Sequence, residues 1–314
     1  SNNNINHLKQ LFMVSIYDFR ERLCVRQKIT CSLLCIGLDP KVEKMPAHIR
    51  TKLDKPDDGL QLALDVANWM IAIVDSTHMY ACMYKPQKAH WEALGKYGQH
   101  ALQLVIDHIK KNYPEIPIFL DCKRGDIDAT QEMYRIAHFD IDGAEGMNFS
   151  PYMGKSCMKA LVDKNYPGRA LVGLCYTSNP DAREVQDPIM ADGRPYWQFI
   201  AERTLAWAEE LDVVENAGLV MAAAYEYPKV SGIVYSDHLR KCREIVGDKM
   251  WFLNPGVGTQ GGFIKETIAA GFVGYGSIAI NNSSEIIFAS NGTDFAEAAQ
   301  MKARGSYDQM ALAV

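Results

Sequence analysis

Short apolar segments alternate along this chain with longer segments in which apolar residues recur every three to four positions. The first kind is typical of buried strands and the second of amphipathic helices, so the alternation predicts repeated β-α units around a parallel sheet. Eight segments are expected to be strands: residues 33–38, 80–85, 118–123, 146–149, 170–175, 219–223, 250–253 and 277–280.

Helices are predicted between these strands and after the last one, over residues 59–74, 98–111, 131–139, 155–164, 196–211, 236–246, 262–270 and 294–304. A further helix over residues 17–26 precedes the first strand. Eight strands with matching crossovers predict a (β/α)8 TIM barrel with an extra N-terminal helix, and a doubly wound open sheet is the structural alternative. Because no linker-like composition divides the chain, we expect one domain over residues 1–314, with residues 1–16 as an N-terminal extension.

Composition narrows the possible partners and the compartment. The formal net charge of -5 and the pI near 5.9 argue against a nucleic-acid or membrane-surface partner, which usually needs a basic stripe. The eight cysteines are widely spread, which favours reduced thiols in a cytoplasmic protein. No second Cys or His pair follows Cys31 and Cys35 at zinc spacing, so no metal is expected. Residues 11–17 form too short an apolar segment for a secretion signal or a membrane span.

Polar residues concentrate where the predicted strands end, which is where parallel barrels carry their functional groups. Asp121 and Lys123 end the third strand and are separated by two positions, so both side chains lie on one face of an extended chain. A carboxylate and an ammonium inside a barrel are costly to desolvate unless they pair. From these residues alone, a buried salt bridge with Asp126 as a helix N-cap is as good an interpretation as a catalytic site.

Several further motifs occur at the other strand ends. They are Gly37-Leu38-Asp39-Pro40, Lys85-Pro86-Gln87, Ser150-Pro151-Tyr152-Met153-Gly154, Thr177-Ser178-Asn179-Pro180 and Pro255-Gly256-Val257-Gly258-x-Gln260-Gly261-Gly262. Together with Asp121-x-Lys123-x-x-Asp126-Ile127-x-x-Thr130, they occur in the order found in orotidine 5'-monophosphate decarboxylases, which this chain therefore resembles over roughly residues 33–304. The Lys-Arg-Gly-Asp-Ile sequence at 123–127 is typical of one bacterial subgroup of that family.

The resemblance implies decarboxylation of orotidine 5'-monophosphate to uridine 5'-monophosphate in pyrimidine biosynthesis, without a metal or cofactor. It implies a catalytic network of alternating charge made of Lys85, Asp121, Lys123 and Asp126, with Lys123 as the proton donor. Asp126 would come from the second subunit of a homodimer with shared active sites.

The resemblance also implies the residues that bind the nucleotide. Asp39, Gln87 and Thr130 would contact the ribose, Ser178 would contact the pyrimidine, and Ile127 belongs to the same motif. Gly258, Gln260 and Gly261 would bind the phosphate. Although glycines at 256, 258 and 261 match a dinucleotide-binding pattern, they follow the seventh strand, where barrels bind a single phosphate.

One position departs from the family pattern. Glu285 follows the eighth strand, where the resemblance predicts an arginine that binds the phosphate. Arg183 or Lys265 is a candidate replacement cation. Two alternatives follow from these observations: a magnesium-dependent sugar-phosphate aldolase or decarboxylase of the related barrel group, and a nucleotide-binding barrel with impaired catalysis.

Overall fold

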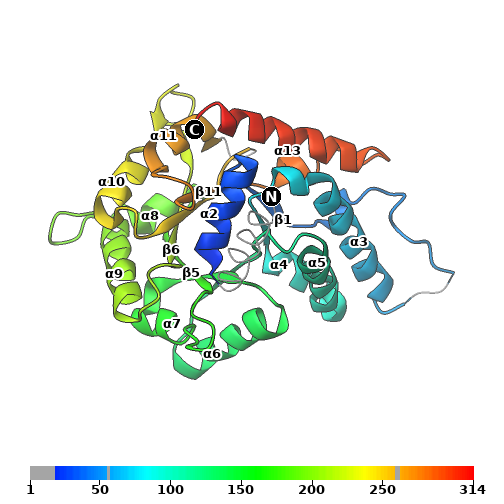
Figure 1. Cartoon of the computed structure of the whole chain (residues 1–314), viewed down its shortest axis with the longest axis horizontal. Coiled ribbons are helices and arrows are strands. Elements are labelled where there is room, and N and C mark those ends of the chain that lie inside the picture. Colours follow the sequence, from blue (N-terminus) through cyan, green and yellow to red (C-terminus); the bar gives the residue numbers. More distant parts are fainter. Residues whose placement is uncertain (1–17, 55–56, 259–261) are drawn as a thin grey trace, which may run out of the picture.

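The computed structural model describes residues 18–54, 57–258 and 262–314. Eight parallel strands form one sheet in the order β2-β1-β11-β9-β6-β5-β4-β3. Two parallel bridges, Tyr84 with Ile118 and Gln87 with Asp121, join β2 to β3 and close the sheet into a barrel (Figure 1). The strands are β1 (Leu34–Leu38), β2 (Met83–Pro86), β3 (Phe119–Arg124), β4 (Gly146–Phe149), β5 (Ala170–Tyr176), β6 (Gly218–Met221), β9 (Trp251–Asn254) and β11 (Ile278–Asn282). The barrel predicted from the alternating pattern is confirmed.

Helices surround the barrel, as the crossovers of parallel strands require (Figure 1). They are α3 (Leu60–Thr77), α4 (Lys88–Glu92), α5 (Gly98–Asn112), α6 (Asp128–Arg135), α7 (Lys155–Lys159), α8 (Ala182–Gln186), α9 (Tyr196–Glu210), α10 (Asp237–Val246), α11 (Ile264–Gly271), α12 (Ser284–Ile287) and α13 (Phe295–Ala311). The helix predicted over 155–164 ends at Lys159. The one predicted over 131–139 begins earlier, as α6, and continues as a π-helical turn, η4 (Ile136–Ile141).

The helix before the first strand is α2 (Phe19–Thr30), which lies across one end of the barrel (Figure 1). Phe19 and Leu23 are buried among side chains contributed by β1, β2, β3, β5, β6, β9 and β11. The Phe19 ring stacks on Trp251 at 5.5 Å between centroids and meets Phe119 edge-on at 6.1 Å. Because Phe119 begins β3 and Trp251 begins β9, α2 covers the N-terminal ends of the strands. The carboxyl ends are therefore the end at which ligands can bind.

A small antiparallel sheet, which the sequence pattern did not predict, lies beyond the carboxyl ends of β6 and β9. Its strands are β7 (Ala224–Glu226), β8 (Val234–Tyr235) and β10 (Gly262–Phe263), in the order β10-β7-β8. Residues 262–263 therefore begin as a strand, and the helix predicted over 262–270 starts at Ile264. Strands of two or three residues are too short to show the period-two pattern.

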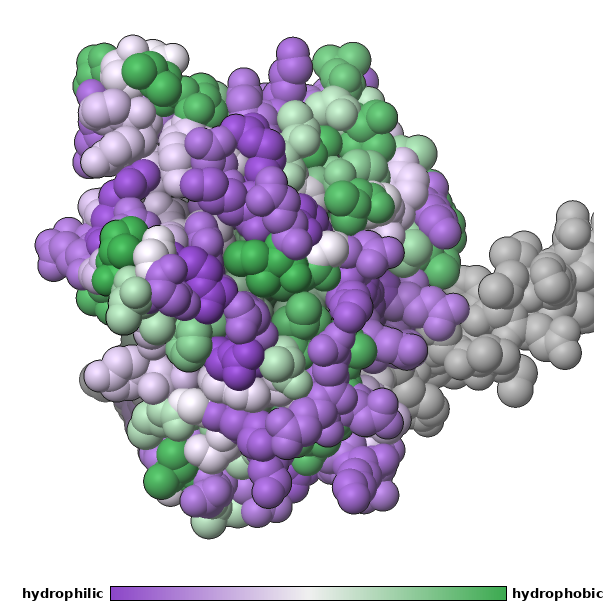
Figure 2. All heavy atoms as spheres, turned by 90° about the vertical axis from the view of Figure 1, so that its left-hand side faces the viewer, coloured by the Kyte–Doolittle hydropathy of each residue, from purple (hydrophilic) through white to green (hydrophobic). Residues whose placement is uncertain are grey.

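Figure 2 shows the side of the molecule on which α9 and α10 lie in Figure 1, with hydrophilic residues interspersed among separate hydrophobic patches. Of the helices in the described parts of the chain, none is long and apolar enough to span a membrane. All eight cysteines are free thiols; six are buried, whereas Cys24 is half-buried and Cys31 is exposed.

Candidate active site

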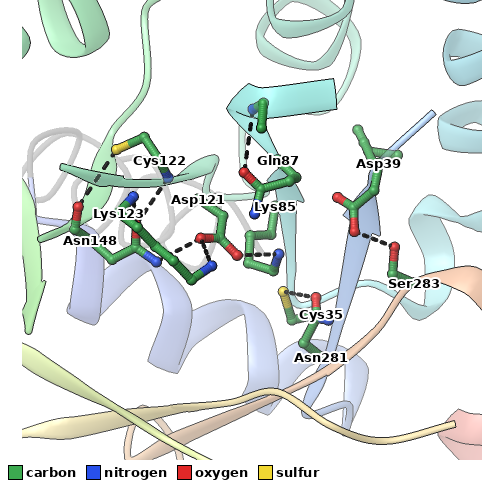
Figure 3. A network of polar contacts seen from close by, with 12 residues as sticks. Cys35, Asp39, Lys85, Gln87, Asp121, Cys122, Lys123, Asn148, Asn281 and Ser283 are labelled. Carbon is green, nitrogen blue, oxygen red and sulfur yellow. Dashed lines mark hydrogen bonds and ion pairs between the residues drawn. The ribbon is translucent and has the colours of Figure 1, made fainter. Parts of the chain in front are cut away.

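Asp121 lies between two lysines at the carboxyl end of the barrel (Figure 3). Its Oδ2 accepts a hydrogen bond from Lys85 Nζ at 2.9 Å, and its Oδ1 accepts one from Lys123 Nζ at 2.6 Å. Asn148, on β4, donates from Nδ2 to the same Oδ1 at 2.8 Å. The period-two spacing on β3 thus brings Asp121 and Lys123 together as predicted, and Lys85 reaches them from the neighbouring strand β2.

The backbone at Lys123 is held in an unusual conformation. Its φ angle is +46°, in the left-handed region that L-residues seldom adopt, and the pairing of β3 with β4 shifts register between Leu120 and Arg124. The Asn148 side chain fixes this irregularity because its Oδ1 accepts from the backbone N–H of Cys122 at 2.9 Å and of Lys123 at 2.7 Å. Backbone strain of this kind persists only where the surroundings impose it, and it is concentrated at functional sites.

The charges in this network differ sharply in exposure. Lys85 is 3% exposed and Asp121 is 7% exposed, whereas 46% of the Lys123 side chain is open to solvent. Burial by itself would raise the pKa of Asp121, but the adjacent Lys85 and Lys123 ammonium groups lower it well below its usual range. Burial would lower the pKa of Lys85, yet Asp121 and Asp39 raise it above its ordinary value. The carboxylate and the buried lysine are therefore both ionised, and Lys123 can reach a ligand.

Asp39 follows β1 on the same end of the barrel and has one oxygen without a partner. Its Oδ2 accepts a hydrogen bond from Ser283 Oγ at 2.6 Å (Figure 3), while its Oδ1 is buried with no hydrogen-bond partner among the described residues. A Cβ atom at Gly37 would lie 2.5 Å from Ser283 Oγ and 3.1 Å from Asp39 Oδ2, so only glycine leaves room for this pair. A buried acceptor without a partner is costly, so this oxygen is available to a hydrogen-bond donor.

Gln87 follows β2, and Asp126, Ile127 and Thr130 follow β3. The Gln87 Oε1 accepts from the Ala89 N–H at 3.4 Å at the start of α4. Ile127 and Thr130 are exposed. The Asp126 carboxylate accepts from the Ile127 N–H at 2.8 Å, and among the described contacts it makes none with Lys85 or Lys123. The N-cap of α6 is Ile127 without a side-chain cap, so the interpretation of Asp126 as that cap is wrong.

The loop after β5 carries Ser178, and hydrogen bonds made by Thr177 stabilise it. Thr177 Oγ1 donates to Asn179 Oδ1 at 2.6 Å, and the Thr177 N–H donates to Gln186 Oε1 at 2.9 Å. Ser178 itself is half-buried. Arg183, a candidate replacement for the phosphate-binding arginine, pairs with Asp187 at 2.9 Å and lies over the Tyr227 ring at 3.8 Å. Its guanidinium is therefore already engaged within this part of the chain.

Glu285 lies directly against Gly258. A Cβ atom at Gly258 would lie 2.9 Å from Glu285 Cδ and 3.0 Å from its Oε2, and Gly258 has a φ of +83° that suits glycine. Asn282 Nδ2 donates to the same carboxylate at 3.2 Å. Lys265, the other candidate cation, is exposed on α11. Two predicted phosphate-binding residues, Gln260 and Gly261, lie outside the described residues.

The sequence patterns did not predict two residues of this site, Asn148 and Ser283. Asn148 lies in the buried strand β4, where a polar residue needs a hydrogen-bond partner. A polar residue within an apolar strand was therefore the one feature of the sequence that could have indicated its role. Ser283 follows β11 just before Glu285, but nothing in the sequence pairs it with Asp39. In the described parts of the chain, no three His, Cys, Asp or Glu side chains cluster as metal ligands would.

These features define a (β/α)8 barrel with a buried network of charges at the carboxyl ends of its strands, where barrels of this class carry their functional groups. A family model described as Orotidine 5'-phosphate decarboxylase / HUMPS family matches residues 58–299, and the chain belongs to that family.

Similar proteins with this name match nearly the whole chain. An orotidine 5'-phosphate decarboxylase of Ralstonia nicotianae is 36% identical over 93% of this chain and 97% of its own length. One of Cellvibrio japonicus is 35% identical over 90% of this chain and 94% of its own. The solved structure of Leishmania donovani OMP decarboxylase is 29% identical, covers 93% of this chain and 99% of that chain, and superposes with a TM-score of 0.70.

Proposed function

We propose that this protein decarboxylates orotidine 5'-monophosphate to uridine 5'-monophosphate, the step its relatives' name describes, in pyrimidine biosynthesis. The observation that carries the proposal is the Lys85–Asp121–Lys123 network at the carboxyl end of the barrel. Family membership and the names of the relatives support the choice of substrate. The network supplies a fixed negative charge, a buried cation and a second cation that is open to a ligand.

The chemistry needs a cation and a proton at carbon six of the pyrimidine ring. Breaking the bond between that carbon and the carboxylate releases carbon dioxide and leaves the electron pair on the ring carbon. A nearby ammonium stabilises the developing charge and then gives its proton to that carbon. We assign this role to Lys123, whose partly exposed side chain can recover a proton from solvent. Asp121 holds both lysines by hydrogen bonds, and its negative charge would repel the carboxylate of the substrate.

The remaining predicted residues would bind the nucleotide. We assign the ribose hydroxyls to Asp39, whose buried Oδ1 lacks a donor, with Gln87 and Thr130 as further sugar contacts. Ser178 would contact the pyrimidine edge. The phosphate would be bound by the loop of Gly258, Gln260 and Gly261.

Asp126 and Ile127 would complete the site of a second subunit in a homodimer. Ile127 is 45% exposed, and Asp126 takes no part in the network of its own chain among the described contacts. A complementation assay tests the sharing of sites: inactive Lys123→Ala and Asp126→Asn proteins are mixed under subunit exchange. Because each mixed dimer would contain one intact site, activity should return, to up to about a quarter of the wild-type value with random pairing. A mixture that stays inactive, although hybrid dimers form, would show that sites are not shared.

The decisive test of the proposed reaction follows the loss of orotidylate absorbance with purified protein, with and without a divalent-metal chelator. We expect turnover that survives chelation. Activity that disappears with the metal would instead favour a magnesium-dependent sugar-phosphate enzyme. Binding of uridylate without any turnover would favour a nucleotide-binding barrel whose catalysis is impaired, the alternative that the departure from the family pattern at Glu285 raised.

We also propose a cytoplasmic location, which the eight free thiols support. Cell fractionation with an antibody against the protein tests this placement, because a secreted or membrane-associated pool would contradict it.

A further inference from the structure

A second chain of polar groups extends from the end of β3 to α4 and to the π-helical turn η4. Arg124, the residue after Lys123, donates from Nε to His138 Nε2 at 3.0 Å. His138 Nδ1 lies 2.8 Å from Asp142 Oδ2, and the same oxygen accepts from Lys88 Nζ at 2.7 Å. We call Arg124, His138, Asp142 and Lys88 the outer network.

Three members of the outer network are withdrawn from water: Lys88 is 5% exposed, and His138 and Asp142 are each 2% exposed. Burying an ammonium and a carboxylate is expensive, and an apolar pair of similar volume is often at least as stable. The second Asp142 oxygen, Oδ1, is buried without a hydrogen-bond partner in the described parts of the chain, so the network is not optimised for stability. Such a costly arrangement needs a reason beyond packing.

The hydrogen bonds fix the protonation of His138. A guanidinium can only donate, so His138 Nε2 must accept from Arg124, and the imidazole proton then lies on Nδ1 and points to Asp142. The imidazole is therefore a neutral bridge between a cation and a carboxylate. The π-helical turn at residues 136–141 places His138 within reach of both groups, and π turns are frequent at functional sites.

The outer network joins β3, which carries Lys123, to α4, which directly follows β2 and its Lys85. Lys88 begins α4 three residues after Lys85, and Arg124 ends β3 next to Lys123. Arg124 also pairs through NH2 with Glu92 Oε1 at 2.6 Å, so both the first and the last residue of α4 are tied to the network. Its guanidinium contacts His138 and Glu92, whereas the Lys123 ammonium contacts Asp121.

We propose that the outer network consists of positioning residues for the decarboxylation: it clamps β3 to α4 and thereby holds Lys123, with its strained backbone, and Lys85 at Asp121. Asn148 holds the N–H groups of Cys122 and Lys123, and Arg124 anchors the chain on the far side of Lys123. The proposal rests on the proposed function and concerns how precisely the proton donor is aimed.

The test measures kcat for orotidylate, KM, affinity for uridylate and thermal stability in His138→Phe and Arg124→Lys proteins. Phenylalanine removes the bridge, and lysine keeps the cation but loses the Nε donor. A displaced proton donor should lower kcat about 10- to 100-fold. KM and uridylate affinity should stay within a few-fold of the wild-type values, because neither residue is assigned to the nucleotide.

A matched control is His108→Phe. His108 also pairs with an aspartate, Asp75, at 2.6 Å, but it lies on α5 and belongs to neither network. Its kcat should equal the wild-type value. The Arg124→Lys protein guards against a folding defect, because the Arg124 side chain is 22% exposed whereas His138 is buried.

A double variant supplies the sharpest distinction. If Arg124 and His138 act as one device, the Arg124→Lys/His138→Phe protein should lose little more kcat than the worse single variant. Wild-type kcat in the folded single variants, with only the melting temperature lowered, would overturn the proposal and leave the network a structural one. Failure of the proposed function looks different, since the wild-type protein itself would then show no turnover.

Discussion

Exchanging Glu285 for arginine should tighten phosphate binding if the glycine loop binds the substrate phosphate. The Glu285 carboxylate lies next to Gly258: its Oε2 would be 3.0 Å from a Cβ atom built at that glycine. At about 4 Å in water, each pair of unit charges is worth about 1 kcal/mol. Replacing the negative side chain by a positive one beside a phosphate of charge near -2 therefore changes the interaction energy by several times about 1 kcal/mol. Screening by salt and the freedom of an exposed side chain reduce the total, so we expect KM for orotidylate to fall about 10- to 100-fold.

The assay is steady-state kinetics at low and high salt on the Glu285→Gln and Glu285→Arg proteins. Glutamine removes only the repulsion, so its KM should lie between the other two, and added salt should reduce all the differences. Binding of orotidine, which lacks the phosphate, should not change. Glu244→Arg, an exposed position on α10, makes the same charge change and should leave KM unaltered. An unchanged KM in Glu285→Arg would refute the reasoning that this carboxylate faces the phosphate.

Three further predictions concern the barrel and the site. The lowered pKa of Asp121 means that its charge stabilises the fold above its unfolded pKa of about 4, and that this contribution disappears as pH falls toward the folded value. The melting-temperature gap between wild type and Asp121→Asn should therefore narrow from pH 7 to pH 3, and a constant gap would argue against the ion pairs. Phe19→Ala should lower the free energy of unfolding by about 3–5 kcal/mol in denaturant titrations, because it leaves a cavity beside Phe119 and Trp251. A loss under about 1 kcal/mol would mean that Phe19 is not packed in the barrel core. Ser283→Ala should raise KM about fivefold with kcat retained, since it frees the Asp39 carboxylate, and a normal KM would show that Asp39 needs no such support.

The barrel was predictable because its strands are buried on both faces and its crossovers are amphipathic. All eight predicted strands exist, with bounds that shift by three residues or fewer. The pairing of Asp121 with Lys123 was predicted from their spacing on one strand, whereas the place of Lys85 beside them was implied by the family resemblance. The strand and charge-pair predictions rest on spacing within single elements.

The remaining features depend on contacts between distant segments, which spacing does not encode. Asn148 bonds to the backbone at Lys123, where the chain departs from regular β geometry. Ser283 bonds to Asp39, which is 244 positions away in the sequence. The π-helical turn that places His138 gives no periodic signal. The role of Asp126 depends on a second subunit, so neither the pattern nor a single chain tests it.

The most direct test of the account compares wild-type protein with Lys123→Ala in the decarboxylation of orotidylate, with uridylate binding as the check on an intact site. We predict that the wild-type protein consumes orotidylate and that the variant binds uridylate but shows no detectable turnover. Turnover within about tenfold of wild type in the variant would mean that the proton comes from elsewhere and would contradict the assignment.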